Sequence, residues 1–248
     1  MSVIAKSFAA ALMVSGLIAG TAPAYTQDTK AVVELFTSQG CSSCPPADEL
    51  LAEYAARDDV IALSLPVDYW DYLGWKDTLA SPEHTQRQRA YADARGDRQV
   101  YTPQVVINGV EHAVGSNAAA IDTAIKETAN GLSIPISMTP GTDSTTVTIG
   151  ASDNPELKKG MIWLALYDDP IAVPIDRGEN TGRTIVYTNV VRKIRPIAMW
   201  MGEEMTVELP MSELVHAGVK HCAVILQTEL DDGLPGPILG AAAVDYSS

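Results

Sequence analysis

The sequence is poor in cysteine, basic residues and long apolar runs, and each shortage excludes a class of protein. Three cysteines in 248 residues are too few for a disulfide-stabilised scaffold. The 17 basic residues are outnumbered by 31 acidic ones, and the resulting charge of −14 disfavours nucleic acid and anionic lipid surfaces as partners. No apolar run beyond the first 24 residues approaches the roughly 20 residues of a spanning helix, so we expect no membrane insertion of the mature chain.

The start of the chain has the pattern of a cleaved export signal. Lys6 precedes an apolar stretch at residues 8–19, and small residues follow at 22–24. The stretch is too short for the alternative, a membrane anchor. We therefore predict a signal peptide at residues 1–24, a flexible mature N-terminus at residues 25–30, and a periplasmic or secreted location.

The next hundred residues mix strand and helix patterns. An apolar run at residues 31–36 is followed by a polar turn, by apolar side chains at helical spacing over residues 47–55, and by a second apolar run at residues 60–65. Strand, helix and strand in this order predict parallel pairing of the two strands. Asn108 and Gly109 between two later apolar runs predict a β-hairpin.

Beyond Gly131 the pattern changes to strands separated by turn residues. The predicted strands are residues 134–138, 145–149, 161–167, 184–194, 205–209, 222–228 and 238–246. We expect an all-β, sandwich-like domain at residues 133–246. The long polar connection at residues 170–183 has the composition of a loop that is either functional or mobile.

Cys41 and Cys44 form a C-x-x-C motif where the first strand gives way to the first helix. Two intervening residues let the sulfurs bridge, and a helix N-terminus favours the thiolate of Cys41, so a redox pair is the leading interpretation. Pro45 and Pro46 remove two amides that would help to stabilise that thiolate. A permanent disulfide and half of a zinc site are the alternatives, and zinc would need two further ligands. Cys222 lies in an apolar strand pattern and is expected to be buried.

An aromatic loop follows the second strand and should emerge beside the cysteines. We predict that Trp70, Tyr72 and Trp75 offer apolar area with polar tips to a substrate. The alternative is that they pack between the two domains or into the core.

Residues 102–109, followed by Val114 and Gly115, resemble the closing half of glutaredoxins and thioredoxins. The resemblance implies a thioredoxin-like domain at residues 31–130 and a cis peptide bond before Pro103. It also implies that Pro103 lies against the cysteine pair and that the backbone of Thr102 meets an extended peptide or thiol substrate. The predicted fold class is thus an α/β thioredoxin-like domain followed by an all-β domain.

Residues 34–48, 67–77 and 86–91 resemble, more closely, an exported bacterial family known as domain of unknown function 1223. The similarity continues through residues 178–180 and 189–192. Members of that family are expected to have a thioredoxin-like domain, and they have no settled activity. Ser42 and Ser43 depart from the Gly-Pro of thioredoxins, which leaves the redox direction open.

These observations predict thiol-disulfide exchange with a protein or a small thiol or disulfide, with Cys41 and Cys44 as catalytic residues and no cofactor or metal. The alternative is a non-catalytic binding module in which the disulfide only braces the fold. A metal chaperone resembling copper-handling thioredoxin-like proteins is disfavoured, because their cysteine spacing is one residue longer.

Overall fold

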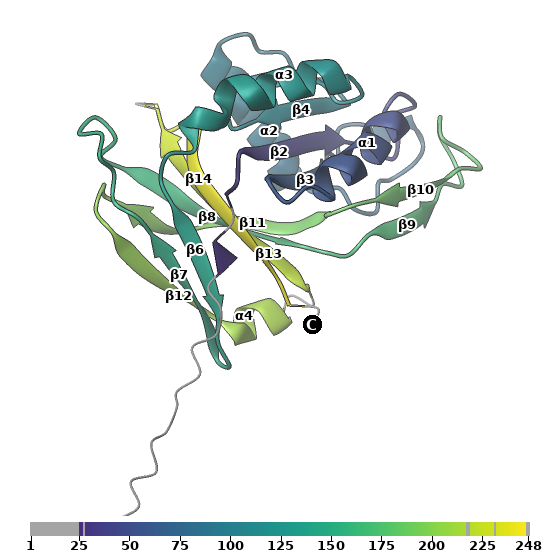
Figure 1. The fold of residues 1–248 in the computed structure, drawn as a ribbon. Helices are drawn as coiled ribbons and strands as arrows, with labels where there is room; N and C mark the ends of the chain where they lie inside the picture. Colours follow the sequence, from purple (N-terminus) through teal and green to yellow (C-terminus); the bar gives the residue numbers. More distant parts are fainter. Residues whose placement is uncertain (1–24, 27, 217–218, 231, 247–248) are drawn as a thin grey trace, which may run out of the picture.

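The computed structural model describes residues 25–26, 28–216, 219–230 and 232–246. The predicted signal peptide at residues 1–24 therefore lies outside the described residues. Figure 1 shows α1 and α3 on one side of a stack of β-sheets. Among the helices of the described ranges, none has both the length and the apolar character that crossing a membrane requires.

The sheet that leads into the cysteine pair has four strands. Their order is β3 (Val60–Pro66), β2 (Ala31–Thr37), β4 (Gln104–Ile107) and β5 (Glu111–Val114). As predicted, β2 pairs in parallel with β3, and β4 and β5 form the hairpin around Asn108 and Gly109. The accompanying helices and 3-10 turns are α1 (Pro45–Ala55), η1 (Asp71–Leu73), α2 (Pro82–Arg95), α3 (Ala118–Thr128) and η2 (Ala129–Gly131).

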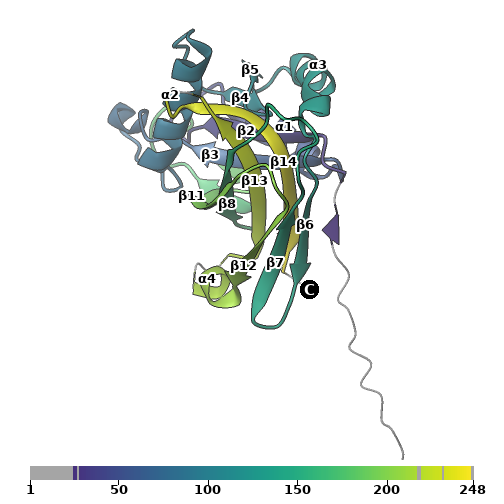
Figure 2. The same ribbon diagram turned by 90° about the vertical axis from the view of Figure 1, so that its left-hand side faces the viewer.

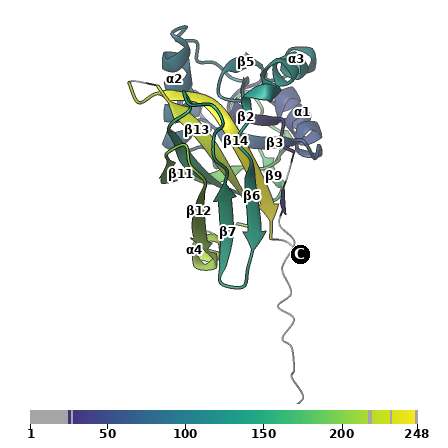
Figure 3. The same ribbon diagram turned by 60° about the vertical axis from the view of Figure 1, so that its left-hand side comes forward.

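Two antiparallel sheets make up most of the second half of the chain. The central sheet has the order β11 (Val191–Trp200), β8 (Gly160–Tyr167), β13 (His221–Glu229) and β14 (Pro235–Asp245). The outer sheet has the order β1 (Tyr25–Thr26), β6 (Ile136–Pro140), β7 (Ser144–Ile149) and β12 (Met205–Pro210), and α4 (Met211–His216) follows β12. β1 lies within residues 25–30, the segment expected to be flexible, and it pairs with β6. Figure 2 shows the curvature of the long strands β13 and β14, and Figure 3 shows β6, β7 and β12 in front of them.

A two-stranded sheet, which we call the arm (residues 171–187), projects beside α1 (Figure 1). It consists of β9 (Ile171–Pro174) and β10 (Thr184–Tyr187), paired antiparallel. The sequence interpretation missed β9, because prolines 170 and 174 bound a short apolar run and proline is depleted in strands. The predicted strand at residues 184–194 is divided between β10 and β11, since Asn189 has a positive φ of 51° that interrupts extended backbone.

The central sheet is buried on both faces. Cys222, Val224 and Leu226 of β13 pack with the outer sheet in one apolar cluster, whereas Ala223 and Ile225 pack with residues of β2 and β3 in another. This alternation follows from the period of two along a strand. A third cluster lies on the other face of the β2 sheet, under α1 and α3.

The predicted fold class, an α/β thioredoxin-like domain followed by an all-β sandwich-like domain, is wrong. Among the described residues the fold is mostly β, with 40% strand against 21% helix and four small sheets. Strand patterns in the sequence locate most of the strands, but they do not specify which faces meet. The two faces of β13 pack into two different apolar clusters. Periodicity alone does not distinguish such a strand from a strand of a separate sandwich. The proposed domain boundary near residues 130–133 stays a prediction.

Candidate functional site

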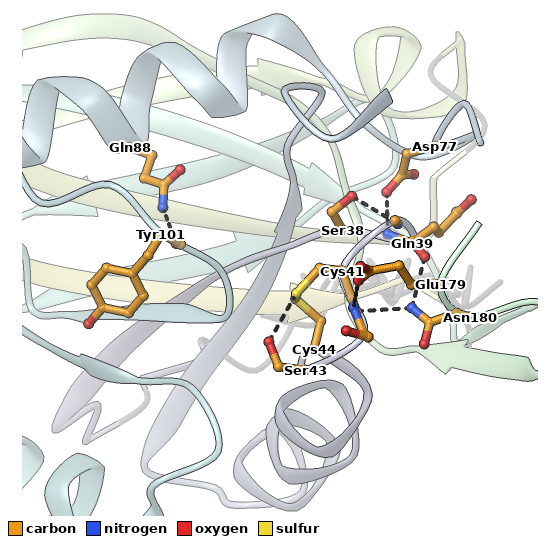
Figure 4. Close-up of a disulfide and its surroundings, with 12 residues drawn as sticks. Ser38, Gln39, Cys41, Ser43, Cys44, Asp77, Gln88, Tyr101, Glu179 and Asn180 are labelled. Carbon is orange, nitrogen blue, oxygen red and sulfur yellow. Dashed lines mark hydrogen bonds between the residues drawn. A yellow bond between two sulfur atoms is a disulfide. The ribbon is translucent and has the colours of Figure 1, made fainter. Parts of the chain in front are cut away.

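Cys41 and Cys44 form a disulfide at the start of α1 (Figure 4). Their Cα atoms are 5.4 Å apart, within the usual range for a disulfide. Cys44 is the N-cap of α1, and its carbonyl oxygen accepts from the amides of Ala47 and Asp48 at 2.8 and 3.1 Å. Pro45 starts the helix because the first helical positions need no amide donor.

The disulfide itself is buried, although the residues between the cysteines are exposed. Cys41 is 2% exposed and Cys44 is 0% exposed, while Ser42 and Ser43 face solvent. Neither cysteine is therefore open to solvent in this state of the protein. The Ser43 hydroxyl lies 3.4 Å from the Cys41 sulfur and is the donor, because a disulfide sulfur carries no proton.

The loop of the arm, residues 175–183, forms direct hydrogen bonds with the segment that carries the cysteines, residues 38–44, which we call the cysteine loop (Figure 4). The Asn180 side-chain amide donates to the carbonyl oxygens of Gln39 and Cys41, both at 2.9 Å. The Glu179 carboxylate accepts from the Ser42 amide at 3.3 Å. Asn180 is fully buried, so these two bonds are shielded from water.

A second layer of polar contacts positions Gln39 beneath this loop. The Gln39 amide donates to the Asp77 carboxylate at 2.7 Å, and the Trp75 indole donates to the Gln39 side chain at 2.8 Å. Trp75 also packs against the apolar cluster of the arm. It lies close to Gly178 as well, because a Cβ added at Gly178 would be 3.3 Å from the Trp75 Cβ. Residues from two distant segments thus hold the cysteine loop in place.

The predicted substrate-binding residues have different surroundings. Tyr72 is 79% exposed, whereas Trp70 and Trp75 are half-buried and pack against apolar clusters. The bond between Thr102 and Pro103 is cis, as predicted, and both residues are buried. A role of these five residues in binding a substrate stays a prediction.

Two buried carboxyl groups accompany the disulfide. Asp48 follows Cys44 by one helical turn, and among the described residues neither of its oxygens has a hydrogen-bond partner. Burial raises the pKa of Asp48 well above its usual range, with the neighbouring Asp77 and Glu49 acting in the same direction and the Thr37 hydroxyl opposing. Burial also raises the pKa of Asp77, although its backbone hydrogen bonds act against the shift.

Cys222 is remote from this chemistry. It is fully buried in β13, as expected, and burial raises the pKa of its thiol to about 11. Its thiol donates to the Tyr246 hydroxyl at 3.7 Å. In the part of the chain that the structure describes, no group of three or more His, Cys, Asp or Glu side chains is arranged to hold a metal ion.

The sequence did not reveal the residues of the arm that contact the backbone around Cys41. Asn180 is 139 residues from its partner Cys41 in the chain, and Glu179 is 137 residues from its partner Ser42. The signal available was the polar composition of residues 170–183 and the family resemblance of residues 178–180. Neither signal tells which surface the loop contacts, because that depends on the packing of the arm against α1.

The fold and the site define a mostly β protein with a buried C-x-x-C disulfide at the start of a helix. The chain belongs to the family described as protein of unknown function DUF1223, whose model matches residues 32–227. A structural-genomics crystal structure of an Agrobacterium tumefaciens protein is similar, with a TM-score of 0.80 and 38% sequence identity over 89% of this chain and 96% of that chain. No curated protein matches the chain significantly.

Proposed function

We propose that the protein carries out thiol-disulfide exchange through Cys41 and Cys44, in the periplasm or outside the cell. The observation that carries this proposal is the disulfide at the start of α1, in a loop whose Ser42 and Ser43 are exposed. A helix N-terminus stabilises a thiolate and so favours a pair that can be reduced and re-formed. The partner is a protein or a small thiol, and the acidic chain disfavours nucleic acid.

In the proposed reaction a partner thiolate attacks the Cys41 sulfur. A mixed disulfide forms, the Cys41–Cys44 bond breaks, and Cys44 leaves as a thiolate that takes up a proton. A second partner thiol then attacks the mixed disulfide and releases Cys41. Two partner thiols are oxidised to one disulfide while Cys41 and Cys44 are reduced, and the reverse sequence reduces a partner disulfide. The Ser43 hydroxyl, 3.4 Å from the Cys41 sulfur, is placed to donate to the Cys41 thiolate.

A binding module with a bracing disulfide is the second candidate. The burial of both cysteines favours it, because a disulfide out of reach of solvent does not exchange rapidly. The two candidates differ in reduction potential. A structural disulfide lies below about −300 mV and an exchanging one above it.

The first test is equilibration of the protein with defined ratios of a reduced and an oxidised thiol at pH 7. We expect a potential above about −300 mV. The second test uses a Cys44→Ser variant in extracts of the periplasm, with Cys41→Ser as the matched control. Partners that link to the first variant and are released by reductant, but do not link to the control, support exchange. A potential below the limit together with no Cys41-dependent link would establish the bracing role instead.

A further inference from the structure

A cavity lies where the first half of the chain meets the central sheet, and we call it the α2 cavity. Its volume is about 300 Å³, and its lining comes from α2, β8, β11, β13 and the start of β14. Figure 3 shows α2 at one end of β13 and β14. Sites for small molecules are concave, enclose about 300–1,000 Å³ and often lie where two parts of a fold meet. The α2 cavity has these properties.

The walls of the α2 cavity are largely apolar. Ala90 of α2, Trp163 of β8, Ile194 of β11 and Pro235 of β14 line it, and each of them is only partly buried. Trp163 and Ile194 pack from this side against the apolar cluster that joins β2 and β3 to the central sheet. An apolar ligand body would remove these half-exposed groups from water, which favours binding.

The buried end of the α2 cavity is polar, but its charge is already matched. Arg87 and Gln227 lie there, and Arg87 donates to the two oxygens of Glu34 at 2.6 and 3.2 Å. The Gln227 oxygen accepts from Arg87, and its nitrogen donates to the Tyr91 hydroxyl and the Gly236 carbonyl oxygen. Because Glu34 pairs with the cation of the described lining, this end offers an anionic ligand no unmatched positive charge.

The open end of the α2 cavity is acidic. Glu83 of α2 and Glu229 of β13 line it, the first exposed and the second partly buried. The Glu83 carboxylate accepts from the Ser81 hydroxyl, a neutral donor that leaves its negative charge in place. Arg195 of β11 does not offset the two carboxylates, since it pairs with Glu213. A positive group at this end would be attracted by both carboxylates, and a negative group would be repelled.

We propose that the α2 cavity binds a small organic cation, an ammonium group carried on an apolar body. The apolar body lies against Ala90, Trp163 and Ile194, and the ammonium group stays at the open end with Glu83 and Glu229. Arg87 keeps the ammonium group away from the buried end. The site is separate from the Cys41–Cys44 disulfide, so the proposal does not rest on thiol-disulfide exchange.

The experiment compares three ligands of similar shape by isothermal titration calorimetry of the full mature chain at pH 7 and low ionic strength. The ligands are phenethylammonium, 2-phenylethanol and 3-phenylpropionate, which are cationic, neutral and anionic. We expect saturable binding of phenethylammonium and about tenfold weaker binding of the alcohol, which lacks the charge. The carboxylate should bind more weakly than the alcohol, because Glu83 and Glu229 repel it.

Variants of the lining locate the binding site. Glu83→Gln and Glu229→Gln should each weaken binding of phenethylammonium about threefold, and the double variant about tenfold. The matched control is Glu53→Gln on α1, which makes the same change of charge at an exposed position outside the lining and should bind like the parent. Ala90→Phe places a ring in the cavity and should abolish binding.

The two glutamate positions are exposed or partly buried, so these variants keep the test decisive if Ala90→Phe does not fold. Three results would each overturn the proposal. They are no saturable binding of phenethylammonium, an equal or higher affinity for the alcohol or the carboxylate, and an affinity for phenethylammonium that the double glutamate variant leaves unchanged.

Discussion

Two buried carboxylates in the same half of the molecule have opposite surroundings. Glu34, on β2, is fully buried and accepts from Arg87 at 2.6 Å and from Tyr91 at 2.5 Å. Asp48, on α1, is 2% exposed, and neither of its carboxylate oxygens makes a well-formed hydrogen bond to a described residue, although the Thr37 hydroxyl acts to lower its pKa. Burial of a charge is tolerated where partners replace water and costly where they do not.

The difference indicates what each region contributes. The Glu34 network also includes Gln227 of β13, and the Arg87 guanidinium lies 5.3 Å from the centre of the Trp163 ring of β8. It therefore connects the first half of the chain to the central sheet. Asp48 and Tyr187 sit instead between α1 and the arm, where hydrogen-bonding capacity is left unused. One region satisfies its buried polar groups, and the other leaves several of them without partners.

The largest effect is expected from breaking the paired site. An Arg87→Met variant leaves the Glu34 carboxylate buried without its cation, and we expect a loss of about 3–5 kcal/mol in the free energy of unfolding. Urea denaturation at pH 7 measures it. A Glu34→Leu, Arg87→Met double variant should recover much of the loss, because no buried charge is left unpaired. A double variant that is less stable than Arg87→Met would show that the pair itself is a major source of stability.

A smaller effect of opposite sign is expected from Asp48→Asn. Because burial raises the pKa of Asp48 in the folded protein above its ordinary value of 3.8, its favourable contribution is present below that value. It is lost as pH rises through the folded pKa. The variant lacks this titration and should be more stable than the parent by about 1–3 kcal/mol at pH 8, with the difference disappearing near pH 3.

Chemical denaturation across this pH range measures the Asp48 effect, and Glu53→Gln is its control. Glu53 is exposed on the same helix and does not contribute to the raised pKa of Asp48, so removing its charge should not produce a stability gain that grows with pH. A constant difference between Asp48→Asn and the parent at all pH values would contradict the assignment of a raised pKa.

The last comparison removes one tyrosine hydroxyl from each region. Tyr91→Phe removes a buried donor to Glu34 and should cost about 1–3 kcal/mol. Tyr187→Phe removes a buried hydroxyl that has no partner among the described residues, and it should change stability by less than about 1 kcal/mol, in the favourable direction. Thermal unfolding of the two variants checks the contrast, and equal losses would refute it.

Local pattern was sufficient for several elements. The apolar run before Cys41 predicts β2, the apolar spacing of residues 47–55 predicts α1, and Asn108 and Gly109 predict the β4–β5 hairpin, because each depends on neighbours in the chain. The bond before Pro103 was predicted from resemblance to other proteins and is cis. The burial of Cys222 followed from its alternation with Val224 and Leu226 in β13.

The sequence by itself thus determined where most of the strands, the cysteine pair and its helix lie, since short-range periodicity and turn chemistry encode them. Tertiary structure alone decided that β13 packs into two apolar clusters, that the fold is mostly β, and that the arm contacts the backbone around Cys41. The physical reason is distance along the chain. Asn180 reaches Cys41 across 139 residues, and Gln227 reaches Arg87 across 140. Such contacts depend on the packing of whole sheets, which no local pattern records.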